Sequence, residues 1–418
     1  MADGVQSPAP FPTKESLSRR PSPALPPPLK TRDHSDHPAA LASMEVRQTM
    51  TTRIAINGFG RIGKQLVKAI HERYWDQVEI VVVGITNSHI TDHRALLLKH
   101  DSLYGDFDAD IRHVVQGRTN AIEVDGRQIE VLGRNLYGPV PEWRRYKVDL
   151  VVEATGIFTA REAARKHLLA GAPRVLISAP GKSPDTTLVM GVNEEQFDPE
   201  QHFIVSNASC TTNCLAPAAK VLNDTFGVQH GLLSTIHAYT SSQVLLDHAG
   251  KDPRRSRAAA FNIVPTSTGA AKAVGLVIPD LNGRFQGDAL RVPTPSVSLA
   301  DFTALVERAP GGAAAVNDAL RAAAAGPMRG VLAVTDAPLV SVDFLGNPHS
   351  SIVDAPATMV QGNMVKTVLW YDNEWGYTCR VADMVYFLTE RIKGRSHADV
   401  RADIIARAPE AELPEVIG

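Results

Sequence analysis

The stretch Ile56-Asn57-Gly58-Phe59-Gly60-Arg61-Ile62-Gly63 decides the fold of this chain, because an apolar run precedes it and a helical pattern follows it. Residues 53–57 predict a buried strand, and residues 64–73 predict a helix. A GxGxxG spacing between them allows a tight turn, close approach of the backbone to a pyrophosphate and a helix N-terminus that faces it. The alternative is a glycine-rich turn that only joins packed elements. The candidate cofactor-binding residues here are Gly58, Gly60, Arg61, Ile62 and Gly63.

Other strand ends extend this candidate nucleotide site. A second strand, residues 78–85, leads to Asn87, where an acidic residue would be expected to bind the ribose hydroxyls. An asparagine keeps a hydrogen-bonding side chain but lacks the charge that would repel a 2′-phosphate, so both NAD and NADP are compatible with it. Thr155 and Gly156 follow a strand at 150–152, and Ser178 follows a strand at 175–177, so we expect all three beside the nucleotide.

A second informative stretch, Ser206-Asn207-Ala208-Ser209-Cys210-Thr211-Thr212-Asn213-Cys214, lies between a short apolar strand and an Ala- and Leu-rich helix. We expect Cys210 near the helix N-terminus, where unpaired N–H groups favour a thiolate. A strand at 231–240 carries His237, the usual second member of a Cys/His pair. An inert core cysteine and a hydrogen-bonded core histidine are the alternatives. Together with the nucleotide motif, the pair indicates oxidation of an aldehyde through a covalent adduct.

Six motifs in order make the chain similar to the phosphorylating glyceraldehyde-3-phosphate dehydrogenase family. They are INGFGRIG at 56–63, SNASCTTNC at 206–214, HAYT at 237–240, PTSTGAAKAV at 265–274, RVPTP at 291–295 and WYDNEWGY at 370–377. The resemblance covers about residues 53–393. It implies that the Cys210 thiolate attacks the aldehyde, that His237 is the base, and that inorganic phosphate attacks the resulting thioester.

The resemblance also implies two phosphate sites and a clamp for the nicotinamide. Thr240 and Arg291 match the site for the substrate phosphate, and Arg291 lies between the two sites. The residues that match the site for the attacking phosphate are Ser209, Thr211, Thr268 and Gly269. Asn373 matches the residue that holds the nicotinamide carboxamide. Without the resemblance, these residues would be interpreted as helix caps, a surface arginine and a polar strand end.

Two departures from the family pattern bear on the cofactor. The loop at 246–257 lacks the proline that strictly NAD-dependent members carry, and together with Asn87 this favours tolerance of NADP. Arg254, Arg255 and Arg257 in this loop would bind a 2′-phosphate or form ion pairs between subunits. Erythrose-4-phosphate dehydrogenase, and a non-catalytic binding or regulatory protein on the same scaffold, are the alternative functions.

Length and composition fit a two-domain enzyme of the α/β class. The chain has 418 residues, a formal net charge of −2 and 44% hydrophobic residues. We expect a Rossmann-type NAD(P)-binding domain at 51–208 with 375–393, and an α+β catalytic domain with a large mixed or antiparallel sheet at 209–374. Strands are expected at 331–334, 339–344 and 365–371 and helices at 269–274 and 375–392, and residues 394–418 form a peripheral tail.

The remaining features concern the ends of the chain and its surroundings. Residues 1–50 are rich in Pro, Ser and Ala and predict disorder, and translation from Met44 or Met50 is a hypothesis. Three cysteines provide no disulfide framework, and no stretch approaches the roughly 18 apolar residues of a membrane span. We therefore expect a cytoplasmic protein, and the resemblance implies an enzyme of glycolysis or gluconeogenesis that needs no metal or nucleic acid and forms a homotetramer.

Overall fold

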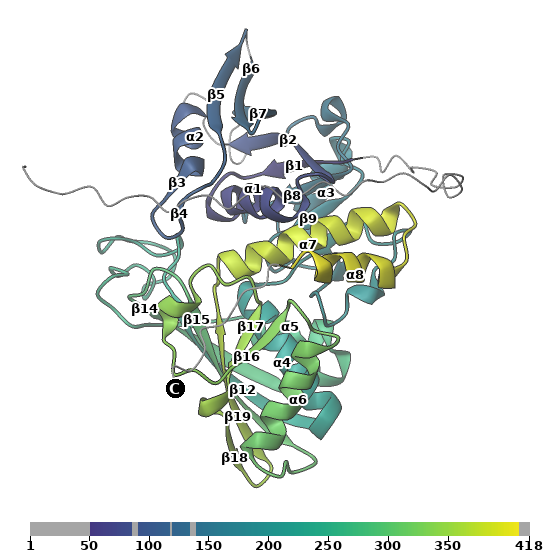
Figure 1. Cartoon of the computed structure of the whole chain (residues 1–418). Helices are drawn as coiled ribbons and strands as arrows, with labels where there is room; N and C mark the ends of the chain where they lie inside the picture. The colour runs from purple at the N-terminus through teal and green to yellow at the C-terminus, as the bar shows by residue number, and fades with distance from the viewer. Residues whose placement is uncertain (1–50, 86–90, 118, 134–138, 409–418) are drawn as a thin grey trace, which may run out of the picture. The chain divides into compact units, whose positions relative to one another are not determined.

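The computed structural model describes residues 51–85, 91–117, 119–133 and 139–408. Asn87 and the segments 1–50 and 409–418, about which the sequence made predictions, lie outside the described residues. Within the described ranges the chain forms two large sheets and a two-stranded one (Figure 1). No helix in these ranges is long and apolar enough to cross a membrane.

The first large sheet, as described, has nine strands in the order β10-β11-β9-β8-β1-β2-β7-β6-β5. All neighbouring pairs from β10 to β7 are parallel, and β5 and β6 extend the sheet in antiparallel fashion. The strands are β1 Thr52–Asn57, β2 Val78–Ile85, β5 Ile111–Gln116, β6 Thr119–Val124, β7 Arg127–Gly133, β8 Leu150–Glu153, β9 Val175–Ile177, β10 Thr186–Thr187 and β11 Ile204–Ser206.

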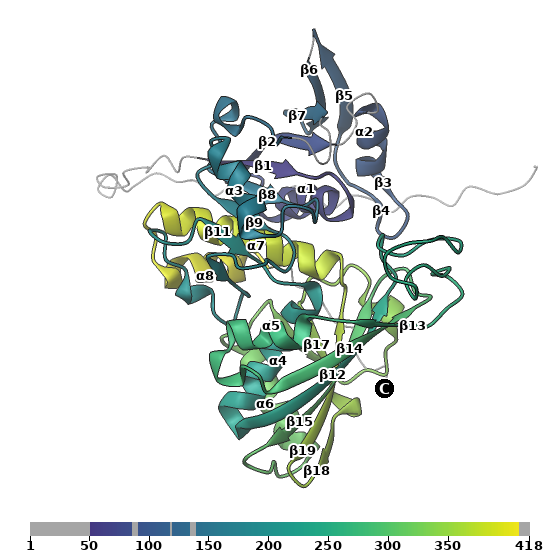
Figure 2. The same cartoon turned by 180° about the vertical axis from the view of Figure 1, so that it is seen from behind.

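Helices cover both faces of this sheet, as its apolar strands require. Ile54 and Ile56 pack with helices α1 (Arg61–Tyr74) and α7 (Trp375–Ile392), whereas Ala55 belongs to a different buried cluster with Trp143. On this second face α3 (Arg161–Leu169) packs on β9 and β11 (Figure 2). Helix α2 (Thr91–Lys99) and the short pair β3 (His100–Asp101) and β4 (Gly105–Asp106) lie near β5. Parallel strands covered by helices on both faces confirm the Rossmann-type architecture.

The second large sheet, as described, has eight mostly antiparallel strands in the order β13-β14-β12-β15-β19-β17-β16, with β18 paired to β19. Helices α4 (Cys210–Phe226), α5 (Ala270–Val277) and α6 (Ala313–Ala325) pack on one face of it through a shared apolar core (Figure 1). The strands are β12 Val228–Ala238, β13 Val264–Ser267, β14 Phe285–Val292, β15 Ser298–Val306, β16 Leu332–Thr335, β17 Ser351–Asp354, β18 Met359–Gln361 and β19 Met364–Tyr371.

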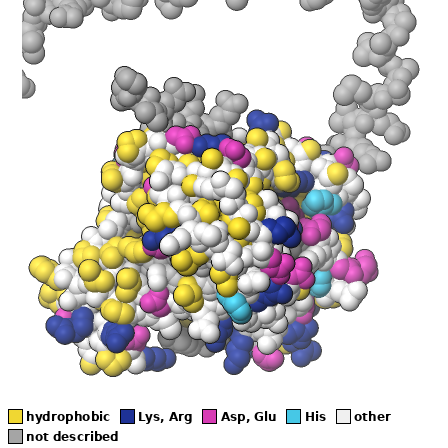
Figure 3. Space-filling view, turned by 90° about the horizontal axis from the view of Figure 1, so that it is seen from below, with side chains coloured by type: hydrophobic (Ala, Val, Ile, Leu, Met, Phe, Trp, Pro, Cys, Tyr) yellow, Lys and Arg dark blue, Asp and Glu magenta, His cyan; other side chains and the backbone are white. Residues whose placement is uncertain are grey.

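The opposite face of the eight-stranded sheet exposes large apolar side chains. Strand pairing places Leu232, Leu305, Met359 and Met364 on this face, because each lies in register with a residue of the same orientation, and all four are exposed. Hydrophobic side chains also gather in patches on the side of the molecule seen in Figure 3. Such a surface is typical of a face that another protein chain covers.

Residues 341–344 and 397–406 have local structure that the sequence did not predict. The strand expected at 339–344 is wrong, because Ser341–Phe344 form a 3₁₀ turn. The Asp343 carboxylate accepts a hydrogen bond from the Val340 N–H (2.8 Å), which closes the turn, and Phe344 is buried and stacks on Trp370. In the tail expected to be peripheral, His397–Ala406 form helix α8, which packs on α7 with Val400 and Ile404 buried.

Candidate active site

A tight turn places Cys210 at the start of α4. Ala208 has φ of +56°, a left-handed conformation that is unusual for a residue with a Cβ. The hydroxyl of Tyr377, on α7, donates to the Ala208 carbonyl (3.0 Å) and holds this turn. Ser209 is the N-cap, because its Oγ accepts from the Thr212 N–H (3.0 Å). The predicted position of Cys210 at a helix N-terminus is confirmed.

Strand β12 brings His237 to this cysteine. The Nε2 atom of His237 lies 3.5 Å from Sγ of Cys210, although the residues are 27 positions apart in sequence. His237 is buried, whereas Cys210 is partly exposed. The two predicted catalytic residues therefore contact each other in a setting that a reactant can reach.

Arg291 contacts the other side of the imidazole. It pairs with His237 in the parallel register of β12 and β14, and its Nη1 lies 2.7 Å from Nδ1 of His237. Nη1 also donates to the Ala238 carbonyl (2.9 Å), which lies 2.7 Å from Nδ1. The ring tautomer decides the roles: without a proton, Nδ1 accepts from Nη1 of Arg291, and with a proton it donates to the Ala238 carbonyl, whose two lone pairs can accept from both groups. In the second tautomer Nε2 faces Cys210 as an acceptor.

The electrostatics of the pair favour a neutral histidine. Burial and then the charge of Arg291 lower the pKa of His237 to about 3, against the hydrogen bond to Ala238. Burial raises the pKa of the Cys210 thiol, while Arg291 and the hydrogen bonds at Thr211 lower it. Desolvation thus opposes the thiolate that the helix end and Arg291 favour. A thiol beside a neutral base can still pass its proton to Nε2.

Tyr371 is a residue of this site that the sequence did not reveal. Its buried hydroxyl lies 2.9 Å from Oγ1 of Thr211 and 2.9 Å from Oγ1 of Thr235, and its ring meets the His237 ring edge to face at 6.0 Å. Tyr371 thus holds Thr211, which follows Cys210, and packs against the imidazole ring of His237. Cys214, one turn further along α4, is buried, and burial raises the pKa of its thiol far above the ordinary range.

Besides Arg291 on β14, the residues expected to bind phosphate lie at three places in the chain. Ser209 and Thr211 lie at the start of α4, and Thr240 follows β12 with its Oγ1 2.9 Å from Oγ of Ser242. Gly269 is the N-cap of α5 without a side-chain cap, and the Thr268 Oγ1 accepts from the Ala270 N–H (3.2 Å).

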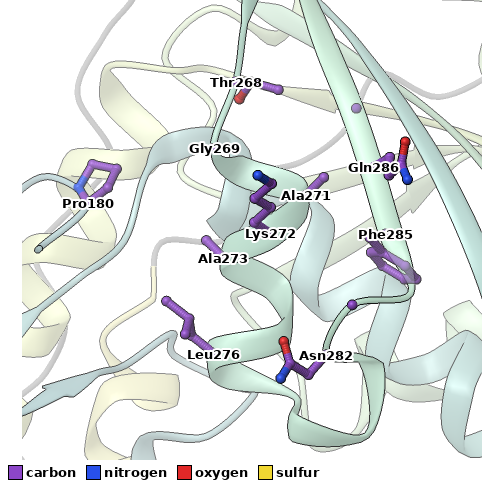
Figure 4. A pocket seen from close by; sticks show the side chains of 12 residues that line it. Pro180, Thr268, Gly269, Ala271, Lys272, Ala273, Leu276, Asn282, Phe285 and Gln286 are labelled. Atoms are coloured by element: carbon purple, nitrogen blue, oxygen red, sulfur yellow. The ribbon is translucent and has the colours of Figure 1, made fainter. Parts of the chain in front are cut away.

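A surface pocket of about 770 Å³ lies along α5 (Figure 4). Thr268 and Gly269 line it, together with Lys272 on the helix and Pro180 from the segment after β9. Neither Cys210 nor His237 lines this pocket. It therefore extends the α5 end of the expected phosphate site and contains no part of the Cys/His pair.

The glycine turn between β1 and α1 fits a dinucleotide. A Cβ on Gly58 would lie 2.7 Å from the carbonyl carbon of Ala154, and one on Gly63 would collide with the carbonyl oxygen of Gly58. By contrast, a Cβ on Gly60 would meet nothing within 4 Å, and Gly60 is the N-cap of α1 without a side-chain cap. The backbone is therefore compressed where helix and strand pack and open where a pyrophosphate would approach. Ile62, the remaining hydrophobic residue of the turn, packs against the core of the first sheet.

A buried carboxylate that the sequence did not reveal, Glu153, holds the neighbouring strand ends. It accepts hydrogen bonds from the Thr155 N–H (2.8 Å) and hydroxyl and from Nδ2 of Asn57 (2.5 Å). His167 lies 3.1 Å away through Nε2, and its Nδ1 accepts from the Trp143 indole (2.9 Å), so Nε2 carries the proton toward Glu153. Burial opposes ionisation, but these donors together hold the pKa of Glu153 below its ordinary value.

The other strand-end residues lie near this carboxylate. The Ser178 hydroxyl donates to the Glu153 carbonyl (3.0 Å), and Gly156 has a φ of +71°, which suits glycine. The sequence does contain a signal that could have identified Glu153, because this acidic residue directly follows the apolar residues 150–152. Thr155 and Ser178 thus converge on one strand end.

Two further sets of contacts concern charged residues. The Arg61 guanidinium pairs with Asp101 (2.6 Å) and Glu374 (2.5 Å), so the side chain joins α1 to the segment before α7. In the loop at 246–257, Arg257 pairs with Asp247 (2.6 Å), and Arg255 lies 3.6 Å from Asp252. Nothing in the described ranges groups three His, Cys, Asp or Glu residues so that they could hold a metal ion.

Asn373 lies just beyond the end of β19. Its Oδ1 accepts from the Ser298 hydroxyl (2.8 Å), whose Oγ in turn accepts from the Ala238 N–H (3.1 Å). The preceding Asp372 accepts from the hydroxyl of Tyr104 (2.9 Å) and from the N–H groups of Glu374 and Trp375 (both 3.0 Å). Asn373 is thereby connected to the strand of His237.

A nucleotide-type sheet beside a Cys/His pair defines a class of coenzyme-dependent enzymes that work through a nucleophilic cysteine. Two family models match the chain: the NAD binding domain of glyceraldehyde 3-phosphate dehydrogenase over residues 52–161, and the C-terminal domain of the same family over residues 209–373. The chain belongs to the glyceraldehyde-3-phosphate dehydrogenase family.

Individual relatives agree with the family models. The chain is 50% identical over 341 residues to glyceraldehyde-3-phosphate dehydrogenase 2 of Nostoc sp. (strain PCC 7120), which covers 81% of this chain and 99% of the relative. It is 48% identical over 346 residues to glyceraldehyde-3-phosphate dehydrogenase 2 of Bacillus subtilis, and this alignment covers 82% of this chain and 98% of the relative. It is 51% identical over 333 residues to the chloroplastic glyceraldehyde-3-phosphate dehydrogenase A of Zea mays, and this alignment covers 79% of this chain and 81% of the relative.

Proposed function

We propose that this chain catalyses the reversible oxidative phosphorylation of D-glyceraldehyde 3-phosphate to 1,3-bisphosphoglycerate, with transfer of a hydride to NAD or NADP. The observation that carries the proposal is the 3.5 Å contact between Sγ of Cys210 and Nε2 of His237 at the start of α4. Membership of the glyceraldehyde-3-phosphate dehydrogenase family supports this reaction above other aldehyde oxidations.

The proposed mechanism begins with the thiol of Cys210. Its proton passes to Nε2 of His237, the thiolate adds to the aldehyde carbon, and the resulting alkoxide takes that proton back from Nε2, which gives a hemithioacetal and a neutral His237. His237 then takes the proton of the hemithioacetal hydroxyl as the hydride leaves, and a thioester of Cys210 results. An oxygen of inorganic phosphate attacks the thioester carbon, the Cys210 thiolate departs, and the acyl phosphate is released.

We assign the phosphate groups to hydroxyls, backbone amides and one guanidinium. Arg291 and Thr240 are proposed to bind the phosphate of the substrate. The attacking phosphate is assigned to Ser209, Thr211, Thr268 and Gly269, which lie at the starts of α4 and α5. Helix N-termini and a forked guanidinium are suitable anion ligands. The position of Arg291 against His237 supports its place between the two sites.

The coenzyme is proposed to lie at the glycine turn, where the nicotinamide ring supplies the hydride acceptor when it is bound. The residues that would hold it are Gly58, Gly60, Arg61, Ile62, Gly63, Asn87, Thr155, Gly156, Ser178 and Asn373. For Arg61 the main-chain N–H is the proposed donor, because carboxylates occupy its guanidinium. The choice between NAD and NADP is assigned to Asn87, so Asn87→Asp should shift the preference toward NAD, and an unchanged ratio of kcat/KM values would overturn this assignment.

We propose a division of labour between the two sheets. Residues 51–208 with 375–393 would bind the coenzyme, residues 209–374 would carry the chemistry, and residues 1–50 would lie outside both domains, whereas α8 in the tail packs on the first domain through α7. The separate apolar cores of the two sheets support this division. Saturating NAD should slow hydrogen exchange at the strand ends of the first sheet more than along β15 and β19, and uniform protection would contradict the division.

We also propose a homotetramer. The exposed apolar face formed by Leu232, Leu305, Met359 and Met364 supports an assembly that buries it, as do the exposed Leu246 and Phe261 in the loops between β12 and β13. Sedimentation equilibrium should give four times the mass of the chain, and a monomer would contradict the proposal. All three cysteines are free, which supports a reducing compartment, proposed as the cytoplasm.

The reaction is tested by steady-state oxidation of glyceraldehyde 3-phosphate with NAD and then NADP, each with and without inorganic phosphate. Phosphate-dependent formation of reduced coenzyme is expected. An oxidation rate that does not depend on inorganic phosphate would contradict an acyl phosphate product. Absence of turnover with this substrate, together with turnover of erythrose 4-phosphate, would assign a different substrate to the same site.

A further inference from the structure

Asn373 has a backbone that is fixed more firmly than its side chain. Asp372 accepts hydrogen bonds from the N–H groups of Glu374 and Trp375, which follow Asn373, and from the Gly346 N–H (2.8 Å). Among the described residues, Ser298 is the one hydrogen-bond partner of the Asn373 side chain. Both residues are at least nine-tenths buried. The orientation of the amide therefore depends on a single hydroxyl group.

The hydroxyl of Ser298 selects one of the two orientations of that amide. Its Oγ already accepts the Ala238 N–H (3.1 Å), so its proton is available to a second partner, which is Oδ1 of Asn373 at 2.8 Å. A reversed amide would direct Nδ2 at the second lone pair of Oγ and would leave the hydroxyl proton without the acceptor that Oδ1 provides. In a buried site an unsatisfied donor is unfavourable, so Oδ1 faces Ser298 and Nδ2 faces away.

Strand pairing explains why these residues meet. Ser298 begins β15 and lies in register with Tyr371, the last residue of β19, and Asn373 follows two positions later. On its other side β15 pairs with β12, which ends at Ala238. The same hydroxyl thus contacts the main chain directly after His237 and the side chain of Asn373.

We propose that Ser298 is a positioning residue for the coenzyme. It holds the Asn373 amide so that Nδ2 is the donor offered to the carboxamide of the nicotinamide, and through that contact it selects the ring face presented to the aldehyde. The inference rests on the proposed function, in which Asn373 holds the carboxamide. The role of Ser298 is indirect, because it acts through Asn373.

A pair of variants of nearly equal volume isolates the hydroxyl. Ser298→Thr keeps it and Ser298→Val replaces it with a methyl group, and both side chains suit a strand. The dissociation constant for NAD, measured by isothermal titration calorimetry without substrate, should be about 2- to 10-fold higher for Ser298→Val than for Ser298→Thr, the range for loss of one hydrogen bond between neutral groups. Ser298→Ala should behave as Ser298→Val does.

Facial selectivity gives a readout that a general loss of stability would not change. With coenzyme deuterated at C4, transfer to or from the wrong face should be about 2- to 10-fold more frequent in Ser298→Val than in Ser298→Thr. Ser296→Ala is the matched control, because Ser296 is a buried serine near Asn373 whose hydroxyl donates to Asp372 (3.2 Å) and not to Asn373. This control should retain the wild-type dissociation constant and selectivity.

The outcomes separate this inference from the proposed function. In an Asn373→Ala background the difference between the Ser298 variants should disappear, because they act through that side chain. Equal NAD binding and equal selectivity of the Thr and Val variants would overturn the role of Ser298, as would a difference that persists without Asn373. A wild-type chain that binds NAD but oxidises no aldehyde would overturn the proposed reaction, while the calorimetric comparison would still decide the role of Ser298.

Discussion

Nη1 of Arg291 lies 2.7 Å from Nδ1 of His237, and both atoms lie within 2.9 Å of the carbonyl oxygen of Ala238. A permanent positive charge at this distance opposes a second positive charge on the imidazole. Burial acts in the same direction, and together they lower the pKa of His237 to about 3. The arrangement therefore keeps the proposed base neutral at pH 7, with its Nε2 3.5 Å from Sγ of Cys210.

The lowered pKa of His237 predicts acid sensitivity of the fold. Between pH 6.5 and 3 the unfolded chain binds a proton at this imidazole that the folded chain does not, so the free energy of unfolding falls as the pH falls through this window. The stabilising contribution is complete above pH 6.5. At about 1.4 kcal/mol per pH unit, His237→Gln should reduce the loss of stability between pH 6.5 and 5 by about 2 kcal/mol. Denaturant unfolding at the two pH values measures it.

His113→Gln is the control for this measurement, because His113 is exposed on β5. It should leave the pH dependence of the unfolding free energy as in the wild type. His349 contributes in the same direction as His237, since burial and the nearby arginines lower its pKa to about 4, so some acid sensitivity persists in His237→Gln. An unchanged slope in His237→Gln would mean that its imidazole is protonated in the folded chain near pH 5.

Replacement of His237 by asparagine tests its role as the base. His237→Asn should lower kcat by roughly two to four orders of magnitude, the usual effect of losing a positioned base. Nε2 lies 3.5 Å from Sγ of Cys210, and an amide cannot accept the proton at that position. The dissociation constant for NAD should not change. The rate of the oxidation step can be measured by stopped flow, and a rate in His237→Asn within a few-fold of the wild-type rate would contradict the role of His237 as the base.

The two cysteines of α4 provide a matched pair of variants. Cys210→Ser should abolish aldehyde oxidation and leave NAD binding intact, because a hydroxyl at this position is a much weaker nucleophile than a thiolate. Cys214→Ala should keep most of the activity, since Cys214 is buried one turn away with its Sγ near Ser351 (4.0 Å). Substantial turnover by Cys210→Ser would remove this residue from the proposed mechanism. Mass spectrometry of the acylated enzyme checks the same step.

The sequence predicted those parts of the fold whose signals are local. The glycine turn predicted the strand before it and the helix after it, and the helix expected at 375–392 has those bounds in α7. Cys210 and His237 were predicted as the nucleophile and the base because of their local sequence: Cys210 lies where a strand leads into a helix, and His237 is the histidine of a nearby apolar strand. The strand expected at 339–344 failed because a single carboxylate, Asp343, closes a turn there, and hydrophobic alternation does not record such a bond.

The residues that support the site could not be predicted, because their function depends on distant partners. Tyr371 bonds to Thr211, which is 160 positions away, and Ser298 bonds to Asn373, which is 75 positions away. Tyr371 lies in the motif WYDNEWGY and Ser298 lies shortly after RVPTP, but neither motif indicates which distant side chain its hydroxyl would contact. Such pairs follow from the register of β12, β15 and β19, which only the folded chain defines.

Glu153 should be the most sensitive carboxylate of the first sheet. Hydrogen bonds from Thr155, Asn57 and His167 compensate for its burial and keep its pKa low. Glu153→Gln removes the charge and directs an NH₂ group at some of these donors, so it should destabilise the fold by about 1–3 kcal/mol, the usual cost of leaving buried hydrogen-bonding groups unsatisfied. It should also raise the dissociation constant for NAD, because Thr155 loses its anchor.

Glu79→Gln is the comparison for this prediction, because Glu79 pairs with Arg53 on the same sheet with both side chains 40% exposed. That pair should contribute less than about 1 kcal/mol. Denaturant unfolding of both variants, with calorimetric titration of NAD, separates the two effects. If Glu153→Gln were as stable as Glu79→Gln, the buried network would have no energetic role. If it were unstable but bound NAD normally, Glu153 would support the fold without positioning Thr155.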